Sequence, residues 1–321
     1  MGLKDISCSP MMEKRLCILF LILFTGMLHF VFIQALAPVQ MGWFNYYGWL
    51  VHDGAVLYKD LYYFLPPQFI LMHVGLYSVF GNHMMLYQVA GMVVIGISIL
   101  CVYDVLCAKF PPVYAAMGCA GGLLIVVGAV LYFPTDYNQI LMSLVIFSVY
   151  FLARSLQYDG ALSLLGAGFF LGMAIFSKQS VIVFALGLLG LYCLVLKKHN
   201  AWNVVFKKLA FLMIGVLLGS LPSVLYLIPT DTFWLSIEEQ IQAAIEAKGN
   251  TAGIEGIFSV FPRFYRYGFS YAEFGIALCS VSLLVCQNTA RAVWGVSIRT
   301  GLVYLLYHLV IYKIFRIYQH E

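Results

Sequence analysis

The sequence predicts an all-α, polytopic membrane protein, and its composition and charge spacing carry that prediction. Of its 321 residues, 63% are hydrophobic and 10% are charged, whereas about a quarter of residues are charged in soluble domains. No Asp, Glu, Lys or Arg occurs at 16–52, 61–103, 110–135, 179–196 or 209–230. Several of these runs exceed the ~20 apolar residues that a helix needs to cross a bilayer. A soluble fold is excluded, and no nucleic-acid partner is expected because the net charge of +4 is scattered along the chain.

Apolar runs of helical length, separated by charges, Gly or Pro, predict about nine transmembrane helices in a single domain spanning 1–321. They lie at 15–37, 84–108, 112–133, 138–156, 160–177, 180–196, 208–228, 270–286 and 297–316. The first run is longer than the roughly 7 to 15 residues of a signal-peptide core. It therefore predicts a retained first span rather than a cleaved signal.

Charge placement decides how the ambiguous apolar segment 66–82 is read. If this segment does not cross, the basic loops all fall on the cytoplasmic side with the N-terminus, as the positive-inside rule requires. Counting it as a span would place the lysine cluster at 197–208 outside. The sequence thus predicts a multi-pass plasma-membrane protein with an external loop at 38–83, which holds surface helices near 42–53 and 66–82.

A second large external loop is predicted at 229–268, and it contains an amphipathic helix. Its apolar face carries Trp234, Ile237, Ile241 and Ile245, and its polar face carries Glu238, Glu239, Gln242 and Glu246. The eight cysteines form no CxxC pair, so neither a disulfide framework nor a metal site is predicted. The sequence identifies no cofactor and gives no support for a divalent metal.

Two external residues stand out as candidates for chemistry. Lys178, in SKQS, lies between two apolar spans with almost no loop around it. A charge at bilayer depth costs roughly 2.5 to 3.5 kcal/mol, so such a lysine is usually paired or functional; the alternative is that it snorkels to the surface at a tight hairpin. Asp136, in FPTDYNQI, begins a predicted span, where an Asp is either catalytic or a helix N-cap.

Three further candidates are charged residues among aromatics. Asp60 follows Lys59 in a tyrosine-rich stretch before Pro66-Pro67. Arg263 and Arg266, in PRFYRYG, are spaced to face the same side of a helix. Such a pair either clamps a phosphate or binds lipid headgroups at the interface.

Several motifs together resemble the GT-C superfamily of membrane glycosyltransferases, which includes protein O-mannosyltransferases and aminoarabinose transferases. The stretch GWFNYYGWLVHDGAVLYKDLYYFLPPQFILMHVGLYSVFG is similar to the family's first external loop. TDYN at 135–138 resembles its acidic second external loop, and GMAIFSKQS at 172–180 resembles its Lys-containing hairpin. In the first loop the matching residues are Gly54, Tyr58, Asp60, Pro66, Pro67, Phe80 and Gly81.

The resemblance implies a GT-C-like fold and transfer of a sugar from a polyprenyl-phosphate donor in the cell envelope. The acceptor would be an extracytoplasmic glycan, lipid or protein. The chemistry needs an external carboxylate as general base and fixed cations for the departing phosphate. We therefore expect Asp136 as the base and Asp60 as a structural or donor-binding acid. Lys178, Arg263 and Arg266 are expected to bind the donor phosphate.

Two departures from the family pattern keep other functions open. Family members place an acid at the start of the first surface helix, where this chain has Gln40 and Met41, and often a basic residue after the FG ending, where it has 86–88 (LYQ). Either the base has moved, or the protein is a catalytically silent homologue that binds polyprenyl lipid or assists a partner. A lipid or sugar transporter is a further alternative. Because such enzymes usually continue well past 321 residues, the resemblance also predicts that the C-terminal region is truncated.

The topology is testable by cysteine accessibility. A single cysteine at Gly81 or Asn82, in a chain freed of its native cysteines, should react with an impermeant maleimide from the outside, because segment 66–82 is predicted not to cross. Labelling from the cytoplasmic side alone would contradict the topology.

Overall fold

The computed structural model describes residues 10–32, 38–132, 135–158, 160–179, 181–199 and 201–248. These residues form ten helices and no strand, apart from one isolated bridge between Leu57 and Leu61. The predicted all-α class is thus confirmed for the described part of the chain. The predicted spans at 270–286 and 297–316 lie outside the described residues.

Seven helices correspond to predicted spans, and three correspond to the predicted surface helices. The first set is α1 (Pro10–Phe32), α4 (Met84–Cys107), α5 (Pro112–Tyr132), α6 (Tyr137–Tyr158), α7 (Ala161–Ile175), α8 (Val181–His199) and α9 (Trp202–Leu227). The second set is α2 (Pro38–His52), α3 (Gln68–Phe80) and α10 (Phe233–Lys248).

Four described helices are long and apolar enough to cross a membrane. They are Met11–Val31, Met84–Cys107, Tyr137–Tyr158 and Trp202–Leu227. The apolar parts of α3, α7 and α8 are shorter. The chain is therefore a multi-pass membrane protein, although the predicted total of nine spans is not confirmed.

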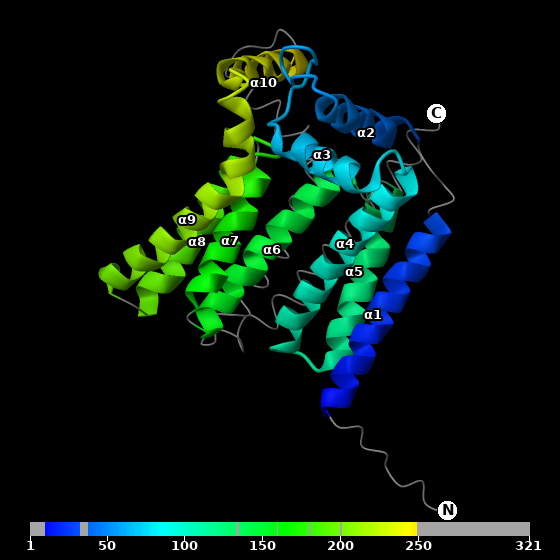
Figure 1. The fold of residues 1–321 in the computed structure, drawn as a ribbon. Coiled ribbons are helices and arrows are strands. Elements are labelled where there is room, and N and C mark those ends of the chain that lie inside the picture. The colour runs from blue at the N-terminus through cyan, green and yellow to red at the C-terminus, as the bar shows by residue number, and fades with distance from the viewer. Residues whose placement is uncertain are drawn as a thin grey trace, which may run out of the picture. The chain divides into compact units, whose positions relative to one another are not determined.

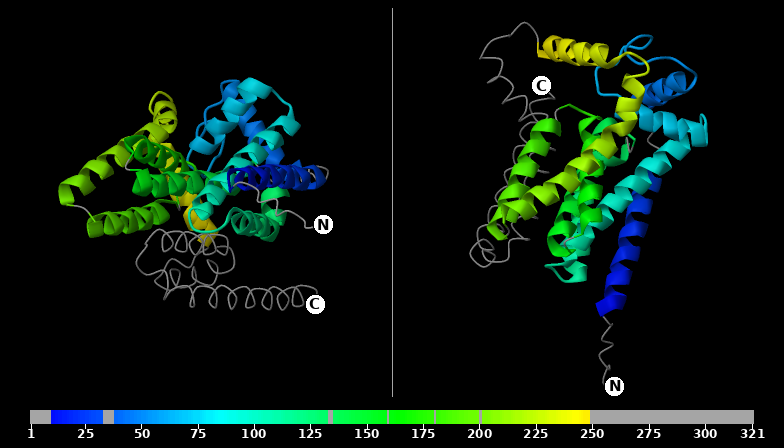
Figure 2. Two further views of the ribbon diagram at one scale, coloured as in Figure 1. Left: turned by 90° about the horizontal axis from the view of Figure 1, so that it is seen from below. Right: turned by 60° about the vertical axis from the view of Figure 1, so that its left-hand side comes forward.

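The long helices run side by side in two groups joined by α6 (Figures 1 and 2). In the first group α1, α4 and α5 contact one another, and in the second α7 packs on α8 and α9. Because α6 contacts both α4 and α7, it connects the two groups.

Helices α2, α3 and α10 lie across one end of these long helices (Figure 1). We call this the loop end, and the opposite end the tail end. Helix α3 has 13 residues and ends at Gly81, which adopts a φ of 57°. At ~1.5 Å per residue such a helix extends about 20 Å, too short for the ~30 Å hydrocarbon layer. Its length and transverse direction both fit a helix that does not cross.

Four glycines allow α7 and α9 to approach until their backbones touch. A Cβ atom added at Gly168 would lie 2.0 Å from the Leu212 carbonyl oxygen, and one at Gly219 would lie 2.0 Å from that of Phe169. Gly172 and Gly215 face the other helix in the same way, with added Cβ atoms 2.3 Å from carbonyl oxygens. The pairs Gly168/Gly172 and Gly215/Gly219 are small-xxx-small motifs, which permit close helix contact in membranes.

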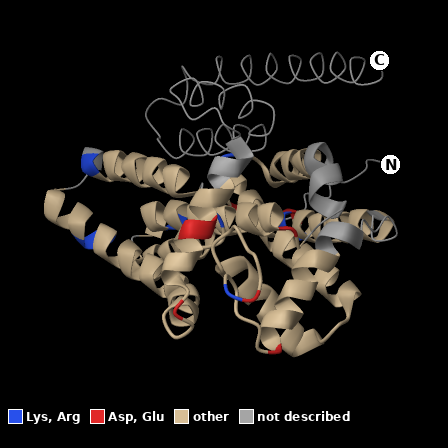
Figure 3. Cartoon of the chain, turned by 90° about the horizontal axis from the view of Figure 1, so that it is seen from above, with Lys and Arg blue, Asp and Glu red and all other residues tan. Residues whose placement is uncertain are grey.

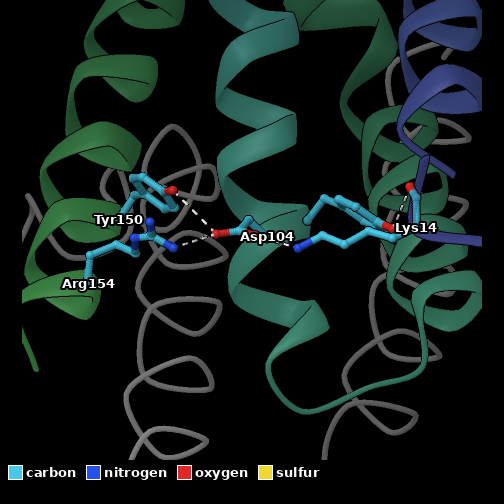
Figure 4. A network of polar contacts seen from close by, with 5 residues as sticks. Lys14, Asp104, Tyr150 and Arg154 are labelled. Carbon is cyan, nitrogen blue, oxygen red and sulfur yellow. Dashed lines mark hydrogen bonds and ion pairs between the residues drawn. The ribbon is translucent and has the colours of Figure 1, made fainter. Parts of the chain in front are cut away.

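At the tail end, Asp104 of α4 joins three helices (Figure 4). Its carboxylate accepts hydrogen bonds from Lys14 Nζ of α1 at 2.9 Å and from Arg154 of α6 at 3.3 Å. The Tyr150 hydroxyl donates to the same carboxylate at 3.3 Å. Sequence analysis did not single out Asp104, because it lies near the end of a predicted span without any recognised motif.

The glycine contact leads to a stability prediction. Gly168→Ala should lower the free energy of unfolding by about 1–3 kcal/mol, because the added methyl group forces the helices apart. Gly190→Ala in α8 is the matched control, since a Cβ there meets nothing within 4 Å. Thermal unfolding in detergent micelles measures both, and equal melting temperatures for the two variants would contradict the close α7–α9 contact.

Candidate functional site

Asp136 lies directly before α6 and caps it. Its carboxylate accepts a hydrogen bond from the Asn138 backbone N–H at 3.0 Å. Its backbone carbonyl accepts from the N–H groups of Gln139 and Ile140, both at 3.0 Å. The capping role left open by the sequence is therefore present, but the side chain is also 7% exposed, which is unusual for an acid.

Burial changes the proton affinity of this carboxyl group. Desolvation is the largest influence and raises the pKa of Asp136, while hydrogen bonds from Asn138 and Tyr137 and the charge of Lys178 act in the opposite direction. The net result is a pKa above the ordinary carboxyl value. An ionised carboxylate with a raised pKa accepts a proton more readily than a solvated one.

Lys178 turns inward toward the start of α6. It lies just after α7, and its Nζ donates to Asn138 Oδ1 at 2.9 Å. The ammonium is also 4.8 Å from the centre of the Tyr137 ring, within cation–π range. Burial lowers the pKa of Lys178, while Tyr137 and Asp136 oppose that effect. Of the two readings of this lysine, the structure supports the paired one.

Asn138 links the carboxylate of Asp136 to the ammonium group of Lys178. Its side-chain amide hydrogen-bonds the Asp136 carboxylate, and its Oδ1 accepts from Lys178. Because the oxygen faces the lysine, the NH₂ group is the part that donates to the carboxylate. We call Asp136, Asn138 and Lys178 the loop-end cluster. Two opposite charges are thus joined through one neutral amide.

Aromatic rings from the transverse helices cover the start of α6. The Tyr137 ring centre lies 5.9 Å from that of Phe44 in α2 and 6.2 Å from that of Phe69 in α3. Phe44 and Phe69 meet edge to face at 4.8 Å. Seen from the loop end, charged residues are sparse over the described part of the chain (Figure 3). The cluster consequently lies in surroundings of low polarity, which strengthen electrostatic interactions.

Gln68, which sequence reasoning missed, ties α3 to the segment that carries Lys178. Its backbone N–H donates to the Phe176 carbonyl at 3.1 Å, two residues before the lysine. Its side-chain oxygen accepts from Ser223 Oγ of α9 at 2.7 Å. The available signal was the pair of polar residues, Gln68 and His73, inside an otherwise apolar segment.

Asp60 lies in an exposed turn rather than in the cluster. Its carboxylate accepts from the Val56 N–H at 2.7 Å. Neighbouring Lys59 donates to the Thr230 carbonyl at 2.6 Å, and the Leu57 N–H donates to the Tyr226 hydroxyl at 2.8 Å. In the described residues this turn is therefore tied to the end of α9. These contacts suit the structural role expected for Asp60 and leave its catalytic role a prediction.

Tyr58, beside that turn, has a backbone conformation that is rare for a large side chain. Its φ is 69°, in the left-handed region that disfavours residues with a Cβ. The buried hydroxyl donates to the Leu65 carbonyl at 2.6 Å, directly before Pro66. Burial raises the pKa of Tyr58 far above its usual value, so the phenol stays protonated as the donor. The bond fixes where α3 begins.

The other predicted phosphate ligands, Arg263 and Arg266, lie outside the described residues. Their convergence with Lys178 therefore stays a prediction. Within the described residues, no group of three or more His, Cys, Asp or Glu side chains is placed to hold a metal ion. The chemistry of the described site rests on a carboxylate, an amide and an ammonium group.

Comparison with known proteins identifies a family for this chain. The family model described as dolichyl-phosphate-mannose-protein mannosyltransferase matches residues 65–226, half of the 321 residues. The matched range contains the whole loop-end cluster and the Pro66-Pro67 pair. No curated protein and no solved structure matches the chain. The chain belongs to the dolichyl-phosphate-mannose-protein mannosyltransferase family of GT-C membrane glycosyltransferases.

Proposed function

We propose that this protein transfers a sugar from a polyprenyl-phosphate donor to an acceptor on the extracytoplasmic face of the membrane. The loop-end cluster carries this proposal, because it holds a buried carboxylate and a half-buried ammonium through one amide. These are the two functions that glycosyl transfer from a lipid phosphate requires. The cluster also lies at the end of the helices, where a lipid donor can present its headgroup.

In the proposed reaction, Asp136 takes the proton from the acceptor hydroxyl. The acceptor oxygen then bonds to C1 of the sugar as the bond between C1 and the phosphate oxygen breaks. The electron pair of that bond leaves with the polyprenyl phosphate, whose added charge Lys178 stabilises. Arg263 and Arg266 are proposed as further phosphate ligands.

Two buried polar atoms beside the cluster have hydrogen-bonding capacity left for a sugar. Thr135 Oγ1 belongs to the residue before Asp136, and Gln179 Oε1 belongs to the residue after Lys178. Neither atom has a hydrogen-bond partner in the structure. Buried polar atoms are rarely left unpaired, so ligand hydroxyl groups are suitable partners for them.

One sequence feature favours a second candidate, a silent homologue that binds polyprenyl lipid without transfer. The acid that the family places at the start of its first surface helix is replaced here by Gln40 and Met41. Neither side chain can act as a base at neutral pH. The two candidates share the phosphate site and differ in whether Asp136 removes a proton.

Asp136→Asn should abolish transfer and leave donor binding nearly intact, because the amide cannot accept the proton. The assay uses proteoliposomes, dolichyl-phosphate mannose or its undecaprenyl counterpart, and a membrane extract as the acceptor source. Asp53→Asn is the control, because Asp53 is an exposed acid at the end of α2 with no role in the proposed reaction. Undiminished transfer by the Asp136 variant would remove this residue from the mechanism.

The raised pKa of Asp136 also predicts a pH profile. The base acts only when ionised, so transfer should be lost as the pH falls through its pKa. That loss should occur at a pH above the ~3.9 of a solvated Asp. A rate that stays constant down to pH 4 would contradict the assignment.

Lys178→Met should weaken binding of undecaprenyl phosphate by about 10- to 100-fold, since a hydrogen bond to a charged group is worth about 1.5–3 kcal/mol. Lys59→Met is the matched control, because Lys59 also lies at the loop end but is exposed and bonds a backbone carbonyl. Microscale thermophoresis in detergent measures the affinity. Weakened binding together with no transfer by the unmodified protein would favour the silent homologue.

A further inference from the structure

Gln68 is a buried amide at the start of α3, and its backbone and side chain bind two different helices. Its backbone N–H donates to the Phe176 carbonyl at 3.1 Å, and its side-chain Oε1 accepts from Ser223 Oγ of α9 at 2.7 Å. Gln68 is 2% exposed and Ser223 is 0% exposed. One residue of α3 therefore joins the end of α7 to α9.

The backbone bond pairs the start of one helix with the end of another. The first N–H groups of a helix and its last carbonyl groups have no partner within the helix. Gln68 is the first residue of α3, whose N-cap Pro67 makes no side-chain cap hydrogen bond, and Phe176 is the C-cap of α7. The bond therefore satisfies one such group on each helix. It also joins the partially positive end of α3 to the partially negative end of α7.

The Ser223 hydroxyl bonds outward instead of back to its own helix. Serine hydroxyls inside helices commonly donate to a carbonyl of the preceding turn, as Ser220 Oγ does to the Leu217 carbonyl at 2.9 Å. Ser223 donates to Gln68 of another helix. Because both polar groups are buried, removing one of them leaves the other without this partner, which costs free energy.

Lys178 lies directly after this junction. Its backbone N–H donates to the Ala174 carbonyl at 3.2 Å, so Lys178 continues the last turn of α7. Phe176, which Gln68 holds, lies within that turn. From there the Lys178 Nζ reaches Asn138 Oδ1 at 2.9 Å. The starting point of the lysine side chain is therefore set by a backbone that Gln68 ties to α3.

We propose that Gln68 is a positioning residue for Lys178, because it holds the end of α7 against α9 and so keeps the ammonium group where the donor phosphate binds. The inference rests on the proposed role of Lys178 as a phosphate ligand. The two bonds act together, since the bond to Ser223 fixes the start of α3 on α9 and the backbone bond passes that position to Phe176. An apolar side chain at position 68 would fill the same space but leave the start of α3 free to shift.

The first measurement follows the backbone and does not depend on phosphate binding. Hydrogen–deuterium exchange with mass spectrometry, on the full chain in detergent, reports how often the amides of residues 68 and 174–178 open. Ser223→Ala removes the donor to Gln68 and should speed exchange at these amides about 2- to 10-fold, the factor that corresponds to one net hydrogen bond. Ser220→Ala is the matched control, because it removes a buried hydroxyl that is bonded within α9, and it should leave these amides unchanged.

The second measurement is the affinity for undecaprenyl phosphate, by microscale thermophoresis. Gln68→Met and Ser223→Ala should each weaken binding about 2- to 10-fold. The double variant should lose no more than either change alone, because both changes remove the same hydrogen bond. In a Lys178→Met background, Ser223→Ala should have no further effect. A merely structural role would weaken binding in both backgrounds, and that result would overturn the proposal.

Gln68→Met and Ser223→Ala test the same bond from its two sides, so one of them suffices if the other does not fold. Unchanged exchange at 174–178 in either folded variant would overturn the proposal. Unchanged affinity would do so too, provided that Lys178→Met weakens binding. If Lys178→Met binds undecaprenyl phosphate as tightly as the unmodified protein, the proposed role of Lys178 fails. The exchange measurement then still decides whether Gln68 holds the segment that carries the lysine.

Discussion

The two hydrogen bonds made by the Asn138 side chain are the interaction on which the loop end depends. They join Asp136, which begins α6, to Lys178, which follows α7. A charge left buried without its partner destabilises a protein by about 3–5 kcal/mol, so the buried carboxylate of Asp136 in particular needs these hydrogen bonds. The ends of α6 and α7 are therefore coupled through polar contacts as well as through apolar packing.

The transverse helices are arranged around this cluster. The backbone N–H of Gln68 donates to the Phe176 carbonyl, two residues before Lys178. Helix α3 thus contacts the segment that carries the lysine, while Phe44 and Phe69 cover Tyr137 between them. Between the long helices, the glycine contact holds α7, which precedes Lys178 in the chain, close to α9.

The family match covers residues 65–226 and does not include residues 40 and 41. The resemblance of the first loop leads one to expect an acid there, and this chain has Gln40 and Met41. The buried carboxylate that the structure does provide lies on another element, at the start of α6. A general base is defined by its reach to the attacking hydroxyl and by its pKa, so a different position does not by itself remove the chemistry. Asp136 meets the second condition, because burial raises its pKa.

The sequence by itself predicted the all-helical class and the family, and the placement of its basic loops predicted that 66–82 does not cross. Charge-free runs and basic loops are local signals, whereas the transverse direction of α3 and its length of 13 residues came from the structure. The sequence also identified Asp136 and Lys178 as unusual, because charged residues are rare in so apolar a chain. Only the tertiary structure decided that Lys178 is paired and that Asp60 belongs to a turn held by α9. The contacts of Gln68 and the glycine contact likewise emerged from packing, because hydrogen bonds and close approaches between distant segments leave no periodic pattern in a sequence.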